Sequence, residues 1–226
     1  MMQFIKQRGI WLATVVLVLT VTALLQISVS YTVAYGALQR VIPGAAQHSI
    51  VMVVLRFGLI GLMAYQWLLG YQRALFRCII LTNGFFTLSL LLQTYALARI
   101  LSGITEHGVD ELLVDVAMIA VMNILIFSIW YWIIDPPGVE EDQGSDEPWE
   151  FMFPQRGSNL PNYEAWIPRY ADYLFLAFTT SFAFSPTDTL PLSKRAKMLM
   201  MLQATISVVT LTGIAGSAIN ILASHT

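Results

Sequence analysis

Long apolar runs with almost no charge recur along the chain and predict its fold class. Three of these runs contain no charged residue, and two contain one each. The runs are residues 10–37, 50–70, 78–98, 112–134 and 198–224. A helix that crosses the apolar core of a bilayer needs about 20 apolar residues. We therefore predict an all-α integral membrane protein, a helical bundle with five full transmembrane spans.

A sixth apolar stretch, residues 173–187, is uncharged but shorter than a full span and contains Ser185-Pro186 near its end. It is either a short re-entrant segment or a sixth membrane segment. Basic residues are retained on the cytoplasmic side of a membrane. With a cytoplasmic N-terminus and a re-entrant segment, most basic residues lie inside, whereas a full crossing moves the cluster at Lys194–Lys197 outside. The charge pattern therefore favours the re-entrant path.

The composition agrees with a membrane location and excludes other classes. The chain is 57% hydrophobic and 12% charged, with a mean hydropathy of +0.67, whereas globular domains are about 25% charged. A net charge of −2 leaves no basic surface for nucleic acid. Cys78 is the single cysteine, so one chain can form neither a disulfide framework nor a cysteine metal site.

A polar linker divides the chain into three parts. These are a four-helix N-terminal membrane bundle (1–134), an acidic linker rich in proline and aromatic residues (135–170), and a pore-loop-like segment with the last transmembrane helix (171–226). The first half of the linker is typical of a mobile acidic loop. The second half suits a strap in the membrane interface, where aromatic rings are favoured. Its aromatic residues are Trp149, Phe151, Phe153, Tyr163 and Trp166.

Two ionisable residues, Arg56 and Asp115, fall inside the predicted spans. A charge in the hydrocarbon region is costly and usually faces protein or water. In the predicted topology, both residues lie shallowly in the same outer half of the membrane. They form either an intramembrane charge pair that locks two helices together, or part of a permeation path or proton relay.

The segment 170–220 combines a short apolar helix, a Ser/Thr/Pro turn, a basic cluster and a long helix with a polar face. This is the order of a pore loop followed by a pore-lining helix. The pore-loop candidates are Thr180, Ser185, Pro186, Thr187 and Asp188. The last helix carries Gln203, Ser207, Thr210 and Ser217 on one face. That face suits either a water-lined cavity or interhelical hydrogen bonds, and Asp188 alternatively caps the turn before Pro191.

No arrangement of residues in the sequence indicates catalysis. His48, His107 and His225 are too scattered for a metal site. The spacings typical of nucleophilic, zinc-dependent or phosphate-binding enzymes are missing from the sequence. We therefore expect no enzymatic activity, no cofactor and no bound metal.

The string AFSPTDTLPLSKRAKMLMMLQ at residues 183–203 is specific. Together with the upstream segments WYWIIDPPG and WEFMFP and with Asn220-Ile221-Leu222, it resembles an uncharacterised family of bacterial integral membrane proteins, the DUF1345 group. The hallmark of that group is AFSPTD-x-x-PL-[ST]-x-x-AK-x-LM-x-x-Q. The resemblance implies a multi-pass protein of the bacterial cytoplasmic membrane, and the family has no established activity.

The same region is more weakly similar to the pore module of two-helix potassium channels. In that module a pore helix leads to T-V-G-Y-G-D-x-x-P and then to an inner helix, and Asp188, Pro191 and the following helix match this ending. Ser185 and Thr187 stand where both glycines belong, and Pro186 stands in place of the tyrosine. The carbonyl geometry of a potassium filter relies on glycine. We therefore expect a degenerate loop that does not select potassium.

Two functions from different classes stay open. The first is a channel-like or transporter-like protein for an unknown small ion or solute, working as a homo-oligomer such as a tetramer in the lipid bilayer. The second is a non-transporting scaffold, sensor or accessory subunit that recruits a partner through its acidic linker. The length of that linker exceeds what a connection requires.

Overall fold

The computed structural model of the chain describes residues 9–29, 48–102, 109–135, 149–156, 163, 166–183 and 188–224. Helices dominate this part, in agreement with the predicted all-α class. The helices are α2 (Gly9–Ser28), α4 (His48–Leu68), α5 (Gln72–Ser102), α6 (Val109–Ile134), α7 (Tyr170–Ala183) and α8 (Lys194–Ser224). Two short strands, β1 (Phe151–Met152) and β2 (Leu190–Pro191), pair antiparallel.

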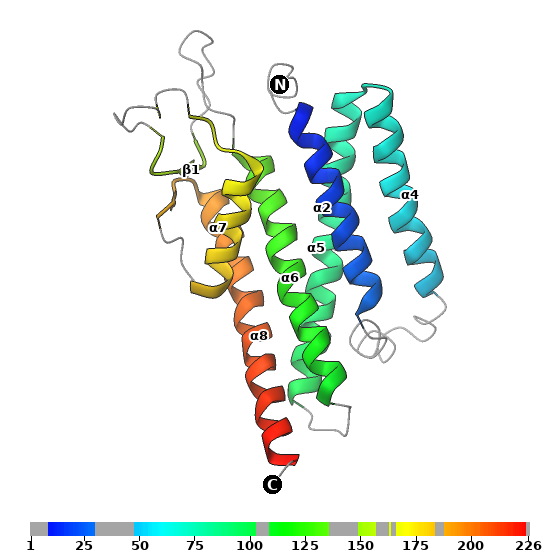
Figure 1. Cartoon of the computed structure of the whole chain (residues 1–226), viewed down its shortest axis with the longest axis vertical. Coiled ribbons are helices and arrows are strands. Elements are labelled where there is room, and N and C mark those ends of the chain that lie inside the picture. The colour runs from blue at the N-terminus through cyan, green and yellow to red at the C-terminus, as the bar shows by residue number, and fades with distance from the viewer. Residues whose placement is uncertain are drawn as a thin grey trace.

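Helix α6 occupies the centre of the bundle (Figure 1) and packs against α2, α5, α7 and α8. Its side chains Phe127, Tyr131 and Trp132 are among the largest fully buried ones. Helix α4 packs against α2 and α5 on one side. Helix α8 lies on the other side, so the bundle has two flanks joined by α6.

Within the described residues, three helices are long and apolar enough to cross a membrane. They are Gln72–Arg99, Leu113–Ile134 and Lys194–Gly216. The prediction of five full spans is therefore not supported. In α2 and α4 the apolar helical stretches are shorter, Leu12–Ser28 and Val53–Leu68. The uncharged run 10–37 is longer than the described helix in it, which ends at Ser28. An uncharged run does not show where a helix ends.

Gly70 ends α4 and turns the chain into α5. Its φ is +72°, a left-handed conformation that glycine adopts without steric cost. The N–H of Tyr71 donates to the carbonyl of Gln66 at 3.0 Å, and the N–H of Gly70 donates to the carbonyl of Trp67 at 3.1 Å. This pair of bonds is the Schellman motif, which satisfies carbonyls left unpaired at a helix C-terminus.

Helices α7 and α8 each begin with a side-chain cap. The N–H of Arg169 donates to Oδ2 of Asp172 at 2.6 Å, which is half of a capping box. The N–H of Ala196 donates to Oγ of Ser193 at 3.1 Å. These caps satisfy N–H groups that have no partner inside a helix.

Candidate functional site

The C-terminal end of α6 carries a buried ion pair. Oδ2 of Asp135 lies 2.8 Å from Nη2 of Arg156, and Nη1 of Arg156 donates to Oδ1 at 3.1 Å. The hydroxyl of Tyr173, on α7, donates to Oδ2 at 2.6 Å. The exposed fraction of the Arg156 side chain is 2%, and that of the Asp135 side chain is 0%. We call Asp135, Arg156 and Tyr173 the ionic hub.

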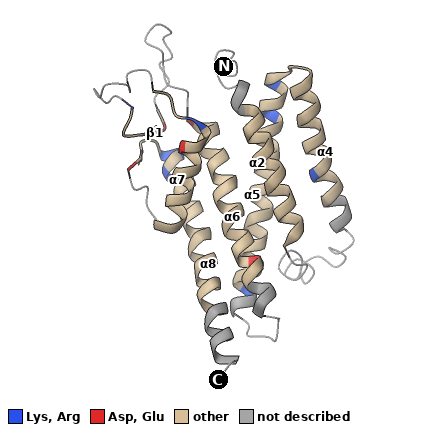
Figure 2. Ribbon diagram, viewed as in Figure 1, with Lys and Arg blue, Asp and Glu red and all other residues tan. Residues whose placement is uncertain are grey.

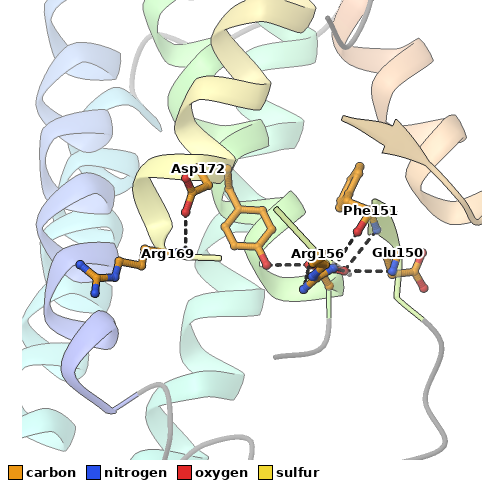
Figure 3. Close-up of polar contacts among 7 residues, drawn as sticks. Glu150, Phe151, Arg156, Arg169 and Asp172 are labelled. Carbon is orange, nitrogen blue, oxygen red and sulfur yellow. Dashed lines mark hydrogen bonds and ion pairs between the residues drawn. The ribbon is translucent and has the colours of Figure 1, made fainter. Parts of the chain in front are cut away.

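Backbone groups of the linker complete the ionic hub (Figure 3). The N–H groups of Glu150 and Phe151 donate to Oδ1 of Asp135 at 2.9 and 3.2 Å. Nη1 of Arg156 donates to the carbonyl of Phe151 at 2.6 Å. A single carboxylate thus holds both the side chain of Arg156 and the backbone of β1, which fixes the linker to the end of α6. Charged partners make such hydrogen bonds stronger than neutral ones.

Aromatic rings enclose the guanidinium of Arg156. Its central carbon lies 4.9 Å from the ring centre of Trp149 and 5.5 Å from that of Phe153. The ring of Phe153 meets Tyr173 edge-on at 5.5 Å and lies 5.6 Å from Trp166. Rings at these distances attract a cation and exclude water from the ion pair.

The linker also binds the start of α8. The side chains of Ser193 and Glu150 share a hydrogen bond, and the N–H of Leu192 donates to the carbonyl of Glu150 at 2.9 Å. In the strand pair, Phe151 lies opposite Pro191 and Met152 opposite Leu190. Together, the ionic hub and Glu150 therefore connect the end of α6 to the beginnings of both α7 and α8.

These contacts give α7 an unusual path. Helix α7 starts at the end of α6, where the hydroxyls of Tyr170 and Ser128 lie 2.6 Å apart. After α7, the chain is back at the same end by β2, because β2 pairs with β1. Helices α7 and α8 therefore start at the same end and run in the same direction, and α7 stops part of the way along the bundle (Figure 1). The chain segments before and after α7 therefore lie at the same end of the bundle.

A second buried cluster, without charge, joins α6, α7 and α8 deeper in the bundle. Nε2 of Gln203 donates to the carbonyl of Ala177 at 2.7 Å and to Oγ of Ser181 at 2.8 Å. Oε1 of Gln203 accepts a hydrogen bond from the hydroxyl of Tyr131. Nδ2 of Asn123 donates to the carbonyl of Gln203 at 3.2 Å and to Oγ of Ser207 at 2.9 Å. We call Gln203, Asn123, Tyr131, Ser181 and Ser207 the amide hub.

The predicted polar face of the last helix thus lies against α6 and α7. Gln203, Ser207 and Thr210 are all buried, and Thr210 donates to the carbonyls of Ile206 and Ser207 in its own helix. Ser217 lies on α8 in a part whose side chains fall outside the description. The bonds of Gln203 are interhelical, as one of the two alternatives expects, and whether the face also lines a pathway stays a prediction.

Two further interfaces of the bundle use the same kind of contact. Nδ2 of Asn83, on α5, donates to the carbonyl of Ile126 on α6 at 3.2 Å. Nε2 of Gln26, on α2, donates to the carbonyl of Phe86 on α5 at 3.2 Å. Interhelical bonds from amides to carbonyls hold helices together where apolar burial gives little driving force.

The predicted pore-loop residues are only partly described. Thr180 is buried on α7 and donates to the carbonyl of Leu176 at 2.7 Å. Asp188 is exposed just before β2. Ser185, Pro186 and Thr187 lie outside the described residues. Their predicted role therefore stays a prediction.

Arg56 and Asp115 lie on α4 and α6, and both side chains are buried. The guanidinium carbon of Arg56 lies 5.9 Å from the ring centre of Phe85. Their predicted pairing stays a prediction. Most of the other charges gather at the end of the bundle where α6 finishes and α7 and α8 begin (Figure 2). In the parts of the chain with a described structure, no group of three or more His, Cys, Asp or Glu could hold a metal ion.

Sequence reasoning missed the ionic hub. In the sequence, Asp135 is only the first residue of the predicted linker, and no local pattern relates it to Arg156. The signal was present in the sequence, because Asp135 follows the apolar run 112–134 directly and has no neighbouring charge of opposite sign. A carboxylate at that depth needs a partner.

Comparisons with known proteins leave the relationship of the chain open. No protein-family model, no curated protein and no solved structure matches it.

Proposed function

We propose that this protein is a multi-pass integral membrane protein with channel-like or transporter-like activity, and that α6, α7 and α8 form its functional unit. In this unit α7 is a re-entrant half-helix, and the pore-loop candidates are Thr180, Ser185, Pro186, Thr187 and Asp188. The loop is degenerate and does not select potassium. The observation that carries the proposal is the path of α7. The chain enters α7 beside the ionic hub and is back at the same end of the bundle at β2, which pairs with β1.

The end of α7 supports a role in ion passage. The last carbonyls of a helix have no partners inside the helix and carry a partial negative charge. Transporters use the ends of such broken helices, inside the membrane, to coordinate cations. Backbone of irregular shape is tolerated at membrane depth only where protein covers it or water reaches it. Small cations are therefore the first species to test.

The distribution of charge supports a cytoplasmic location for the end that carries the ionic hub. Arg73 and Arg77 lie near the start of α5, and Lys194, Arg195 and Lys197 lie at the start of α8. Basic residues gather on the cytoplasmic side. In this orientation the N-terminus is cytoplasmic and α7 enters from inside the cell.

The test is a flux assay on the full chain in liposomes loaded with potassium, sodium or chloride. We expect wild-type liposomes to be leakier than empty ones for at least one ion, and Asp188→Asn to change that flux. Asp172→Asn is the matched control, because Asp172 only caps the other end of α7. Wild-type liposomes no leakier than empty ones would overturn the proposal.

One observation favours the second candidate, a partner-recruiting scaffold. Asp135 and Glu150 enclose residues 136–149, which contain five acidic and no basic residues. The N–H of Glu150 lies 2.9 Å from Oδ1 of Asp135, so both ends of this acidic segment are anchored at one point. Deletion of residues 138–147 leaves the ionic hub intact and should abolish capture of a specific partner. Failure of the intact protein to enrich any partner would exclude this candidate.

A further inference from the structure

The first turn of α8 carries a compact group of positive charges. Lys194, Arg195 and Lys197 all lie there, their side chains are exposed, and the turn contains no acidic residue. None of the three forms an ion pair with another described residue. Like charges this close repel one another, and the positive end of the helix dipole adds to the repulsion. An anion bound from outside the described fold would relieve it.

The acidic residues of the same region are largely engaged elsewhere. From residue 135 to residue 224 the structure describes four of them. Three accept hydrogen bonds inside the fold, and these are Asp135, Glu150 and Asp172. The fourth, Asp188, is exposed. One exposed carboxylate cannot neutralise three cations, so the described surface at the start of α8 keeps a net positive charge.

Exposed apolar side chains border the cations on the side of β2. Leu190 and Leu192 are 61% and 49% exposed, and Met152, opposite Leu190 in the strand pair, is 37% exposed. Residues directly opposite each other, and residues two apart along a strand, share one face of a sheet. The N–H of Leu192 donates to the carbonyl of Glu150 at 2.9 Å, which extends the pairing to Leu192. The strand pair therefore presents three apolar side chains on one face, next to the start of α8 (Figure 1).

Along one face of α8, charged side chains come first and apolar ones follow. Lys194, Lys197, Met198 and Met201 share that face, because they are three, four and seven residues apart. Met198 and Met201 are 63% and 57% exposed, and Met201 lies about 10 Å beyond Lys194 along the axis. The apolar stretch then continues to Gly216. We call the three cations, the two methionines and the apolar face of the strand pair the β2–α8 surface.

We infer that the β2–α8 surface binds an anionic phospholipid, with its phosphate at the cations and its acyl chains along Met198 and Met201. A leaflet presents headgroups first and chains deeper, which is the order of side chains on α8. Basic residues beside a membrane attract anionic lipids. A free phosphate would leave the leucines and methionines in water. A zwitterionic lipid covers the apolar side chains but adds a positive charge to the three already present.

This inference goes beyond the proposed function and rests only on its statement that α8 lies in a membrane. The lipid contact does not depend on any flux. Glu150 links the start of α8 to the linker through Ser193 and Leu192. A lipid bound at the β2–α8 surface would therefore also hold the strand pair at the level of the headgroups.

Lipid retention by the full chain tests the contact. Detergent-purified protein is mixed with equal amounts of phosphatidylglycerol and phosphatidylcholine, and native mass spectrometry counts each lipid bound. We expect the wild-type chain to retain more phosphatidylglycerol. The variant Arg195→Gln with Lys197→Gln should lose most of this preference, since each basic residue beside a membrane contributes about fivefold to binding. Arg195→Lys with Lys197→Arg keeps both charges and should keep the preference.

The matched control is Arg73→Gln with Arg77→Gln. These two arginines are exposed near the start of α5, so the same number of charges is removed from another helix. We expect a clearly smaller loss than at the β2–α8 surface. An equal loss would mean that lipids respond only to the total charge and would overturn the inference, as would a wild-type chain without preference.

Two further arms identify the occupant. Glycerol phosphate, an anion without acyl chains, should not displace phosphatidylglycerol, and displacement at equal concentration would show a site for free anions and overturn the inference. Deletion of residues 138–147 should leave the preference unchanged. A preference that appeared only after this deletion would show that the acidic segment of the chain covers the surface, which would also overturn it. Phosphatidylglycerol retention together with silent liposomes would retain the lipid contact and reject the proposed function.

Discussion

The ionic hub and the amide hub join the same three helices by different chemistry. The ionic hub uses a carboxylate and a guanidinium at the end of α6, with backbone N–H groups of the linker as further donors. The amide hub, deeper in the bundle, uses a glutamine, an asparagine, a tyrosine and two serines without any charge. The change in chemistry follows depth along the helices.

This difference shows where in the bundle a buried ion pair is tolerated and where neutral amides are used instead. Ions are costly to bury, and a buried pair is stable only when further hydrogen bonds satisfy both partners. At the end of α6, the linker supplies those bonds. In the middle of the bundle, a neutral amide can both donate and accept, so it crosslinks helices without an uncompensated charge. We expect the ionic hub to be stronger but more easily destroyed by a single substitution.

The largest effect should come from Arg156→Ala. It leaves Asp135 buried without its cation, and removal of one partner of a buried pair costs about 3–5 kcal/mol of unfolding free energy. Denaturant unfolding in detergent micelles measures it. The matched control is Arg169→Ala, since Arg169 is an exposed arginine and the substitution keeps its backbone N–H for the capping of α7. An effect of Arg156→Ala no larger than that of Arg169→Ala would contradict the role of the ion pair.

The next effect compares one hydroxyl in each hub. Tyr173→Phe removes a donor to the charged Asp135, and hydrogen bonds to charged groups contribute about 1.5–3 kcal/mol. Tyr131→Phe removes a donor to the neutral Gln203, and such bonds inside membrane proteins average about 0.6 kcal/mol. The same unfolding measurement applies to both variants. If Tyr131→Phe were the more destabilising, the ranking of the two hubs would be reversed.

Gln203→Leu tests the amide hub as a unit. Leucine keeps the approximate volume but leaves Tyr131, Ser181 and the carbonyl of Ala177 without their shared partner. We expect a loss of about 1–2 kcal/mol, because several weak bonds are removed together. Met200→Leu on the same buried face serves as the apolar control and should change stability less. Equal effects would mean that the amide hub acts by packing alone.

The smallest effect should come from Asp172→Ala, outside both hubs. It removes the side-chain acceptor for the N–H of Arg169 at the start of α7, and loss of such a cap costs about 0.5–2 kcal/mol. We expect the lower end of that range, because water can replace the partner at this partly exposed site. A change as large as that of Arg156→Ala would show that the capping of α7, and not the ion pair, controls the fold.

The cores of α5, α6 and α8 could be predicted from the sequence, since each contains one of the apolar runs. The helices extend beyond those runs, for example from Gln72 to Ser102 in α5, because charged residues at the ends do not interrupt a helix. The prediction of five full spans is not supported within the described residues, since apolarity shows neither where α2 ends nor how α4 begins. The polar face of α8 was recognised from spacing, but its partners Tyr131 and Asn123 depend on helix packing.

The linker illustrates what local pattern cannot provide. Its aromatic residues predict a strap in the membrane interface, which stays a prediction, but the pattern does not show that Phe151 and Phe153 are buried in the protein itself. They pack on Tyr131 and Tyr173 at ring distances of 5.2 and 5.5 Å. The Asp135–Arg156 pair spans a proline-rich segment, so no helical or strand periodicity connects its two partners. Only the tertiary fold brings them together.

The path of α7 can be tested directly by labelling the chain on both sides of this helix. In a Cys78→Ala background, Tyr163→Cys and Leu192→Cys place thiols at exposed positions before and after α7. A membrane-impermeant maleimide is added to vesicles of right-side-out and inverted orientation. If α7 is a re-entrant half-helix, both positions are labelled from the same face. Labelling of the two positions from opposite faces would show that α7 crosses the membrane and would contradict the proposed path of α7.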